Sequence, residues 1–208
     1  MRDGIWTPKE RRLLERLDTP RKIQDYLDSI DYDHEEGFRS PRYVMAKRKA
    51  QCFGGAALAA AAMEYHGRPP VVVYMINEED DGDDHLIAVF KNDGGWGAVS
   101  KSNFTGLRYR DPVYRSLREL IMSYFDGYFN EEGWKTLRTY SVPVDLRRFD
   151  HLNWRTSEEF AMPADKALEV ARHYKLLTQK MKRSLEKADK RQLAAELLGA
   201  NVERLFKA

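Results

Sequence analysis

The chain has 208 residues, of which 42% are hydrophobic and 33% charged, and its formal net charge is +2. The hydrophobic share allows a real core, and the nearly balanced charge excludes an overall nucleic-acid footprint. One cysteine cannot form an internal disulfide, which fits a reducing compartment. The N-terminus has no apolar signal region, and the apolar run near residue 60 is too short to span a membrane. We therefore expect a cytoplasmic protein.

Two helices are predicted at the start of the chain. Thr7 would cap the first helix, and Glu10 completes a capping box with it. A second helix is predicted from Pro20, because apolar residues follow at helical spacing. The polar stretch 32–40 predicts a loop, and Pro41 would open a short turn before the cysteine.

The middle of the chain predicts a helix followed by a small antiparallel sheet. The alanine-rich stretch 56–63 is helical and would stop near His66. The β-branched run 71–76 predicts a buried strand. Within residues 86–101, the sequence Asn92-Asp93-Gly94-Gly95 is a strong signal for a hairpin between two strands.

The second half of the chain mixes helical and extended patterns. Apolar and aromatic residues over 114–128 predict an amphipathic helix with one aromatic face. Residues 136–144 predict one more strand, and residues 146–154 follow no regular pattern. The order of elements is typical of an α+β fold.

The C-terminal segment is predicted to be helical. Residues 156–159 resemble a capping box, and the helical pattern runs from Pro163 with a break at 188–189. We therefore expect an α+β domain over residues 1–155 and a helical extension over residues 156–208.

The lone cysteine, Cys52, lies where a nucleophile would be built. The polar run 47–51 precedes it and Phe53-Gly54-Gly55 follows, which places the thiol in the first turn of the predicted helix. Free backbone N–H groups and the positive end of the helix dipole favour thiolate over thiol there. A lone cysteine is more often an inert buried residue, so its neighbours must decide between the two roles.

A histidine is a suitable base for a thiol nucleophile. His85 opens a core-like strand, Leu86-Ile87-Ala88-Val89-Phe90, after the cysteine helix. His66 lies at a helix end, where a cation complements the dipole. The other histidines fall in a polar loop, an irregular stretch and the C-terminal helix: His34, His151 and His173. We predict His85 as the catalytic base, against a structural strand-end role.

Two further roles have several candidates. In a hairpin centred on Gly94, the residues opposite the histidine fall near Ser100, Ser102 and Asn103, and each of these could orient an imidazole. Asn103 is chemically the best, because its amide oxygen accepts a ring N–H, but a register open by one or two residues leaves the choice undecided. Gln51 could donate its amide to an oxyanion beside the thiol, or be a plain neighbour of the helix cap.

Together these residues resemble the core of transglutaminase-like proteins, which belong to the wider papain-like thiol enzymes. That family's pattern is Gln-Cys-Trp, a helix ending in Gly-Ile-Pro, a strand opening with His, then Gly-Trp-x-x-Val-Asp. This chain has Gln51-Cys52-Phe53, Gly67-x-Pro69-Pro70, His85 and Gly95-Trp96-x-Ala98-Val99, within residues 40–105. The resemblance implies a papain-like fold, with an antiparallel sheet packed on the cysteine helix, Cys52 as nucleophile and His85 as base.

One residue departs from the family pattern. Ser100 stands four residues after the tryptophan, where the family has its aspartate, and an uncharged serine is a poorer orienter of imidazolium. Asn103 would compensate, as an asparagine does in papain-like proteases. The segment after residue 105 suggests a bacterial branch of this superfamily.

The resemblance implies thiol-dependent acyl transfer on an amide bond of a peptide, isopeptide or protein substrate, without a cofactor. Hydrolysis is favoured over cross-linking, because water is the default second acceptor. The serine at position 100 also motivates an alternative: a catalytically degenerate scaffold that binds a peptide or protein partner.

Two charged segments of the sequence are further candidates for binding. The acidic run 78–84 lacks the distal glutamate of an EF-hand and does not lie between two helices, which favours a solvated turn over a calcium site. Its charge could raise the pKa of His85 or select cationic substrates. The basic C-terminal helices could contact an acidic partner, but sparse aromatic residues there disfavour nucleic acid. Neither a metal nor a membrane contact is expected.

Overall fold

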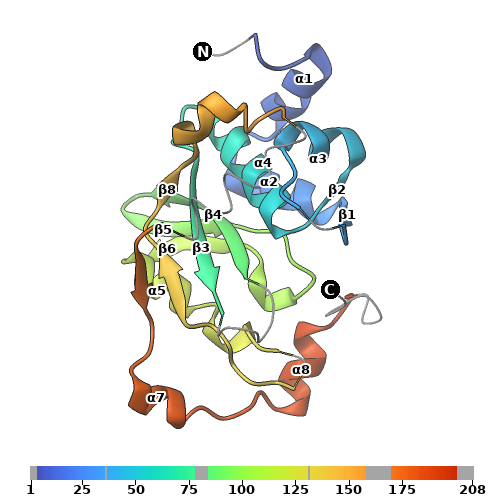
Figure 1. Cartoon of the computed structure of the whole chain (residues 1–208). Coiled ribbons are helices and arrows are strands. Elements are labelled where there is room, and N and C mark those ends of the chain that lie inside the picture. Colours follow the sequence, from blue (N-terminus) through green and yellow to red (C-terminus); the bar gives the residue numbers. More distant parts are fainter. Residues whose placement is uncertain (1–3, 36, 78–83, 131, 158–169, 201–208) are drawn as a thin grey trace.

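The computed structural model describes residues 4–35, 37–77, 84–130, 132–157 and 170–200. Its helices are α1 (Pro8–Arg16), α2 (Pro20–Asp28), α3 (Pro41–Lys47), α4 (Cys52–Tyr65), α5 (Leu117–Met122), α7 (Gln179–Arg183) and α8 (Lys190–Glu196). Short 3₁₀ turns lie at Thr105–Leu107, Phe125–Gly127 and Leu146–Leu152. Figure 1 shows α1 to α4 gathered at one end of the molecule and α7 and α8 at the other.

An antiparallel sheet lies between these two groups of helices. The strands are β1 (Asp31–Tyr32), β2 (Lys49–Ala50), β3 (Val71–Ile76), β4 (His85–Asn92), β5 (Gly95–Val99), β6 (Arg110–Tyr114), β7 (Thr139–Ser141), β8 (Val144–Asp145) and β9 (His173–Lys175). The seven-stranded sheet has the order β6-β5-β4-β3-β7-β9, and β8 also pairs with β3. Its pairings are antiparallel, whereas β1 and β2 form a separate parallel pair. The α+β class predicted from the sequence is confirmed.

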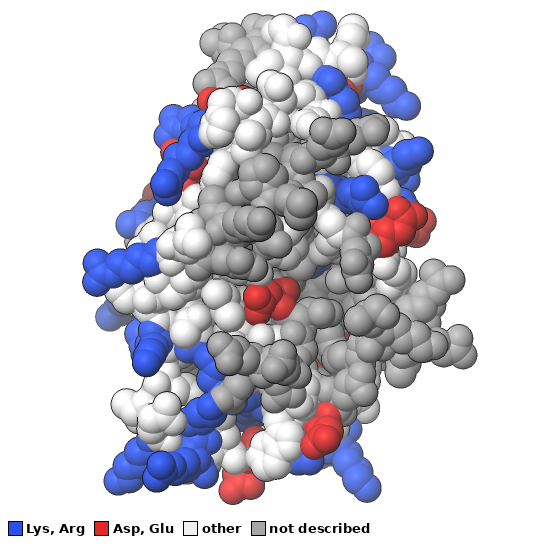
Figure 2. Space-filling view, in the orientation of Figure 1, with Lys and Arg blue, Asp and Glu red and all other residues white. Residues whose placement is uncertain are grey.

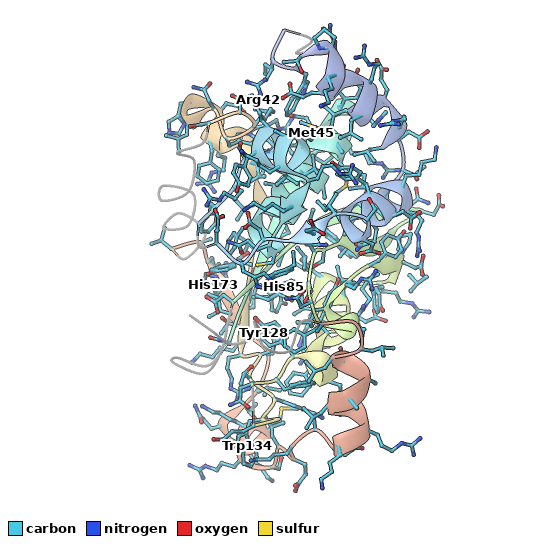
Figure 3. All side chains as sticks on the ribbon, turned by 90° about the vertical axis from the view of Figure 1, so that its right-hand side faces the viewer. Arg42, Met45, His85, Tyr128, Trp134 and His173 are labelled. Atoms are coloured by element: carbon cyan, nitrogen blue, oxygen red, sulfur yellow. The ribbon has the colours of Figure 1, made fainter. Side chains whose placement is uncertain are left out.

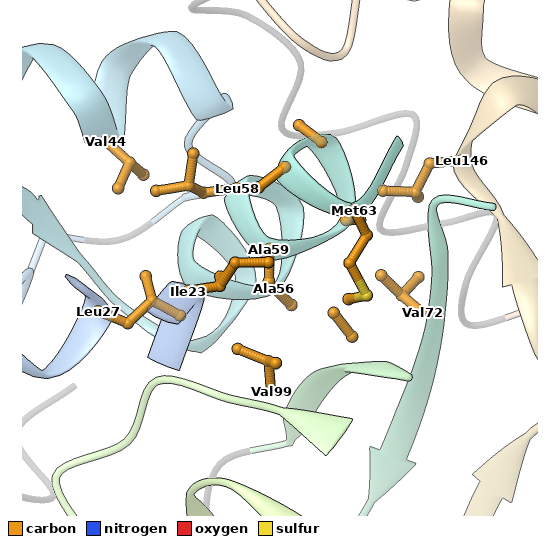
Figure 4. Close-up of a cluster of buried hydrophobic side chains, with 14 of the residues drawn as sticks. Ile23, Leu27, Val44, Ala56, Leu58, Ala59, Met63, Val72, Val99 and Leu146 are labelled. Atoms are coloured by element: carbon orange, nitrogen blue, oxygen red, sulfur yellow. The ribbon is translucent and has the colours of Figure 1, made fainter. Parts of the chain in front are cut away.

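The sheet separates two hydrophobic clusters. Because side chains alternate along a strand, Leu86, Ala88 and Phe90 of β4 face α4, whereas Ile87 and Val89 face the cluster that contains α5. Figure 4 shows the first cluster, in which α4 packs between α2, α3 and the sheet. The helix α4 is buried on all sides from Ala56 to Met63, so small alanine side chains suit its central place.

Several predicted local signals are confirmed. The Thr7 hydroxyl accepts from the Glu10 amide at 3.3 Å, and the Glu10 carboxylate accepts from the Thr7 amide at 2.7 Å, which completes the capping box. The helix α2 begins at Pro20. Asp93 and Gly94 have positive φ angles of 48° and 84° in the hairpin between β4 and β5, as a two-residue type I′ turn requires.

Two predictions before residue 130 are wrong. Pro41 does not open a turn but begins α3, because the Ser40 hydroxyl caps the helix by accepting from the Tyr43 amide at 3.3 Å. The long helix predicted over 114–128 is interrupted, since Tyr114 belongs to β6 and pairs with Trp96. Only α5 and a 3₁₀ turn remain helical there, although the aromatic residues of this segment are still largely buried.

Two predictions after residue 130 also need correction. The strand predicted over 136–144 divides into β7 and β8, because Pro143 lies between them and has no N–H to donate. Residues 173–175 are not helical: they form β9, an edge strand that pairs with β7, so part of the predicted helical extension belongs to the sheet. The acidic run at 78–83, positions 158–159 of the predicted capping box and residues 163–169 lie outside the described residues.

The helices within the described ranges are all too short or too polar to cross a lipid bilayer.

The start of α4 tolerates only glycine at one position, which gives a test of the packing. A Cβ added at Gly55 would lie 2.4 Å from the Lys101 Cβ, whereas one at Gly54 would lie 3.0 Å from a Val44 methyl. Both substitutions to alanine gain the same helix propensity, about 1 kcal/mol. Gly55→Ala should therefore lower the free energy of unfolding by at least about 1 kcal/mol relative to Gly54→Ala in urea titrations. Equal stability of the two variants would contradict this packing.

Candidate active site around Cys52

The thiol of Cys52 lies at the first residue of α4, as the sequence predicts. Gln51 is the N-cap residue, and its side chain makes no capping hydrogen bond to the amides of the first turn. Only 7% of Cys52 is exposed. The helix therefore aims its positive end at a thiol that is nearly buried.

Among the described residues, two oxygen acceptors lie within hydrogen-bond range of the thiol proton. Sγ of Cys52 lies 3.5 Å from Oε1 of Gln51 and 3.9 Å from the Asp84 carbonyl oxygen. Both oxygens accept, so this arrangement suits a protonated thiol. The Gln51 amide donates through Nε2 to the Gly37 carbonyl at 2.8 Å, and it turns its oxygen, not its N–H, toward the sulfur. One N–H of the Gln51 amide is thus used by Gly37, so only the other N–H could donate to an oxyanion.

The start of β4 is held firmly beside the thiol. The Tyr74 hydroxyl donates to the Asp84 carboxylate at 2.7 Å, and the Asn77 amide donates to the same carboxylate at 3.0 Å. The Asp84 carbonyl precedes His85 directly, so standard bond lengths place Sγ of Cys52 within roughly 8 Å of the His85 Cα. The fold thus brings Cys52 close to His85 at the start of β4.

The imidazole of His85 is bound through one of its two nitrogens. Nε2 lies 2.6 Å from the Ser100 hydroxyl and 3.2 Å from the Leu107 carbonyl oxygen. A carbonyl only accepts, so this network assigns the proton to Nε2 and the lone pair to Nδ1. Burial lowers the pKa of His85 to about 4, against the opposing effect of the Leu107 carbonyl. The ring is therefore neutral at pH 7, with Nδ1 as its basic atom.

The register of β4 determines on which side of the sheet the His85 imidazole lies. His85 pairs with Met75, whose side chain lies in the cluster opposite α4, so the imidazole approaches from the α5 side of the sheet. Cys52 approaches from the α4 side, and within the described part of the chain no hydrogen bond joins the thiol to the ring. Both residues therefore lie near the start of β4, on opposite sides of the sheet.

Of the three predicted orienting residues, the structure brings Ser100 to His85. Ser100 is fully buried and makes the short contact with Nε2. The Ser102 hydroxyl accepts from the Phe104 amide at 3.0 Å within a turn. Asn103 lines a separate pocket with residues 28–35.

A residue that the sequence reasoning missed holds Ser100 in place. Gln24 of α2 is 1% exposed and accepts from the Ser100 amide at 3.0 Å, while its own amide donates to the Ser100 carbonyl at 2.9 Å. Gln24 also donates to the Asp28 carboxylate at 2.9 Å. Each of these three hydrogen bonds joins a donor to an acceptor, so the buried amide is well satisfied. The available signal was a polar residue beside Ile23 and Leu27 on the apolar face of a helix.

Aromatic side chains lie beside the thiol on the α4 side of the sheet. The Phe53 ring lies 3.7 Å from that of Phe38 and 5.6 Å from that of Tyr74, centroid to centroid. His173 of β9 extends this row at 6.5 Å from Tyr74, and burial lowers its pKa although the Asp84 charge opposes this. Figure 3 labels His85 and His173, which lie at a similar level of the sheet. The row begins at Phe53, the residue that follows Cys52 in α4.

The remaining histidines and the basic segment lie away from the thiol. Nε2 of His66 contacts the Leu14 carbonyl at 2.8 Å, where His66 caps α4. Figure 2 shows Lys and Arg side chains along the lower left edge, where β9 and α7 lie in Figure 1. Contact of these cations with an acidic partner stays a prediction. Across the described ranges, no group of three or more His, Cys, Asp or Glu side chains is arranged to hold a metal ion.

No protein-family model matches this chain, and no curated protein matches it either. Its function is therefore inferred from the residues around Cys52 themselves.

The buried neutral state of His85 predicts a specific loss of stability in acid. The pKa of His85 is lower in the folded protein (about 4) than its ordinary value of about 6.5, so the unfolded chain binds the proton first as pH falls. Its contribution is complete above pH 7 and is lost progressively between about pH 6.5 and 4, up to about 3 kcal/mol. His85→Gln retains a donor at Nε2 but does not titrate. The difference in unfolding free energy between wild type and variant should change over this range, and a constant difference would contradict the assignment.

The two hydrogen bonds between Gln24 and the backbone of Ser100 can be tested by a substitution that leaves the net charge unchanged. Gln24→Leu leaves the Ser100 amide and carbonyl buried without these partners, which should lower the free energy of unfolding by about 2 kcal/mol or more. Gln179→Leu at the exposed start of α7 is the matched control and should change it by less than about 0.5 kcal/mol. If both substitutions change the free energy of unfolding equally in denaturant titrations, the hydrogen bonds of Gln24 to Ser100 do not stabilise the fold as proposed.

Proposed function

We propose that this protein is a thiol-dependent acyl-transfer enzyme with a papain-like fold, which cleaves an amide bond in a peptide or protein. The observation that carries the proposal is the hydrogen bonding of His85, whose Nε2 is held by Ser100 and Leu107. This leaves Nδ1 as the basic nitrogen at the strand end beside Cys52. The helix α4 packed on antiparallel strands supports the papain-like arrangement.

In the first half of the proposed reaction, the Cys52 sulfur attacks the carbonyl carbon of the amide. The thiol proton moves to Nδ1 of His85 as the S–C bond forms, and the carbonyl oxygen becomes an oxyanion. The amides of the first turn of α4, at the positive end of the helix, stabilise that oxyanion. The C–N bond then breaks, His85 returns its proton to the leaving amine, and a thioester on Cys52 remains.

In the second half, an acceptor removes the acyl group from the sulfur. Water attacks the thioester while Nδ1 of His85 takes its proton, and collapse of the intermediate releases a carboxylic acid and restores the thiol. We favour hydrolysis over cross-linking because this step needs no second substrate. The proposed role of Ser100 is to hold the ring by its Nε2, which leaves the lone pair on Nδ1 for the thiol proton.

The lowered pKa of His85 sets the timing of proton transfer in this mechanism. Because the imidazole is neutral at pH 7, with a pKa of about 4, it does not form a thiolate–imidazolium ion pair in the resting protein. The resting thiol instead donates to Gln51 and Asp84. Proton transfer to His85 therefore accompanies attack, as general-base catalysis, and does not precede it.

The test is acylation of Cys52 by an activated ester. Wild type treated with p-nitrophenyl acetate should release a burst of p-nitrophenol and carry one acetyl group on Cys52 by mass spectrometry. His85→Gln should slow this acylation at least tenfold at pH 7, because general-base catalysis contributes on the order of a hundredfold or more. Cys52→Ala should abolish the burst, and Ser100→Ala should fall between wild type and His85→Gln.

A second candidate, a catalytically degenerate scaffold that binds a peptide, is favoured by one observation. The thiol is nearly buried and donates to two acceptors, which stabilises the unreactive form. This scaffold predicts slow modification of Cys52, at the same rate with and without His85. Acylation that ignores His85→Gln would reject the enzyme and leave the scaffold.

A further inference from the structure

One of the two partners of the His85 ring determines which ring nitrogen carries the proton. The Leu107 carbonyl oxygen, 3.2 Å from Nε2, can only accept, so this contact requires a proton on Nε2. The Ser100 hydroxyl, 2.6 Å from Nε2, can accept from that nitrogen or donate to it, because a hydroxyl group rotates. Without the carbonyl, Ser100 could donate to Nε2, and the ring proton would then lie on Nδ1. The position of the Leu107 carbonyl therefore fixes the tautomer.

Leu107 ends the 3₁₀ turn Thr105–Leu107, and two distant side chains hold the middle residue of this turn. The Arg110 guanidinium donates through Nη2 to the Gly106 carbonyl. On the other side of the same residue, the Gly106 amide donates to the carboxylate of Glu196, which belongs to α8. A hydrogen bond to a carboxylate is roughly twice as strong as one between neutral groups. The C-terminal helix α8 thus contributes a strong contact to the turn that carries the Leu107 carbonyl.

Two glycines leave room for the Glu196 carboxylate. A Cβ added at Gly127 would lie 2.8 Å from Oε1 of Glu196, and a Cβ added at Gly106 would lie closer still. Neither glycine has a positive φ angle, so the backbone itself would accept alanine at both positions. The Thr105 hydroxyl adds a further contact, at 3.3 Å from Oε2 of Glu196 and 3.0 Å from the Ala195 carbonyl oxygen. The carboxylate therefore lies in a slot that the absence of two side chains creates.

We propose that Glu196 is a positioning residue of the thiol site, which keeps the proton of His85 on Nε2 by holding the turn that carries the Leu107 carbonyl. The contacts pass from Glu196 to the Gly106 amide, along the backbone to the next residue, and from its carbonyl to the ring. The consequence for catalysis rests on the proposed function, because only a ring protonated on Nε2 offers the lone pair of Nδ1 to the Cys52 proton.

The tautomer can be measured directly by nuclear magnetic resonance at pH 7. Two-bond ¹H–¹⁵N correlations in histidine-labelled protein show which nitrogen of His85 carries the proton. Wild type should carry it on Nε2. Glu196→Ala should raise the ratio of the Nδ1-protonated to the Nε2-protonated ring at least about threefold, which corresponds to the loss of one hydrogen bond. Glu196→Gln keeps an oxygen that accepts from the Gly106 amide and should retain the wild-type tautomer.

Two further variants separate this contact from a general loosening of α8. Gly106→Ala displaces the carboxylate from the opposite side, so it should change the tautomer in the same direction and add little in combination with Glu196→Ala. Glu186→Ala removes an exposed carboxylate from the same C-terminal segment and should change nothing. A wild-type tautomer in Glu196→Ala, an equal change in Glu186→Ala, or a wild-type ring protonated on Nδ1 would overturn the proposal.

Acylation of Cys52 by p-nitrophenyl acetate then connects the tautomer with catalysis. Glu196→Ala should slow the acylation by the factor by which it depletes the Nε2-protonated ring. Slower acylation with an unchanged tautomer would overturn the positioning role of Glu196, while the acyl transfer of wild type would stand. If wild type itself is not acylated, the proposed function fails, whereas the change of tautomer in Glu196→Ala still supports the control of His85 by α8.

Discussion

The packing of α4 against the sheet is the constraint on which the other features depend. Glycine and alanine let this helix be buried on all sides, because larger side chains would hold α2, α3 and β4 further away. Gly55 meets the side chain of Lys101, which follows directly after Ser100. The position of the helix therefore sets both the place of the Cys52 thiol and that of the residue that holds His85.

A buried polar network transmits this constraint to the imidazole. Gln24 from α2 bonds both backbone groups of Ser100, and Ser100 in turn contacts His85 at 2.6 Å. In a low-dielectric interior such a network is stable only when each member is satisfied, so it favours one arrangement of the ring. The same burial keeps His85 neutral, which makes the ring a base that acts during attack and not a standing partner of a thiolate.

Local signals in the sequence determined much of this protein. The capping box at Thr7, the turn at Asp93-Gly94 and the helix that starts at Cys52 each depend on a few neighbouring residues, and each was predicted correctly. The hairpin centred on Gly94 also predicted that residues near Ser100, Ser102 and Asn103 would lie close to His85, and Ser100 contacts it.

Tertiary structure decided the features that depend on distant contacts. The strand β9 forms in a segment with a helical pattern because the edge of β7 offers it hydrogen bonds, and no local signal reports that edge. The choice of Ser100 over Asn103 followed from the register and from Gln24, which lies 76 residues away in the chain. The neutral state of His85 arises from burial, and burial exists only once the chain has folded.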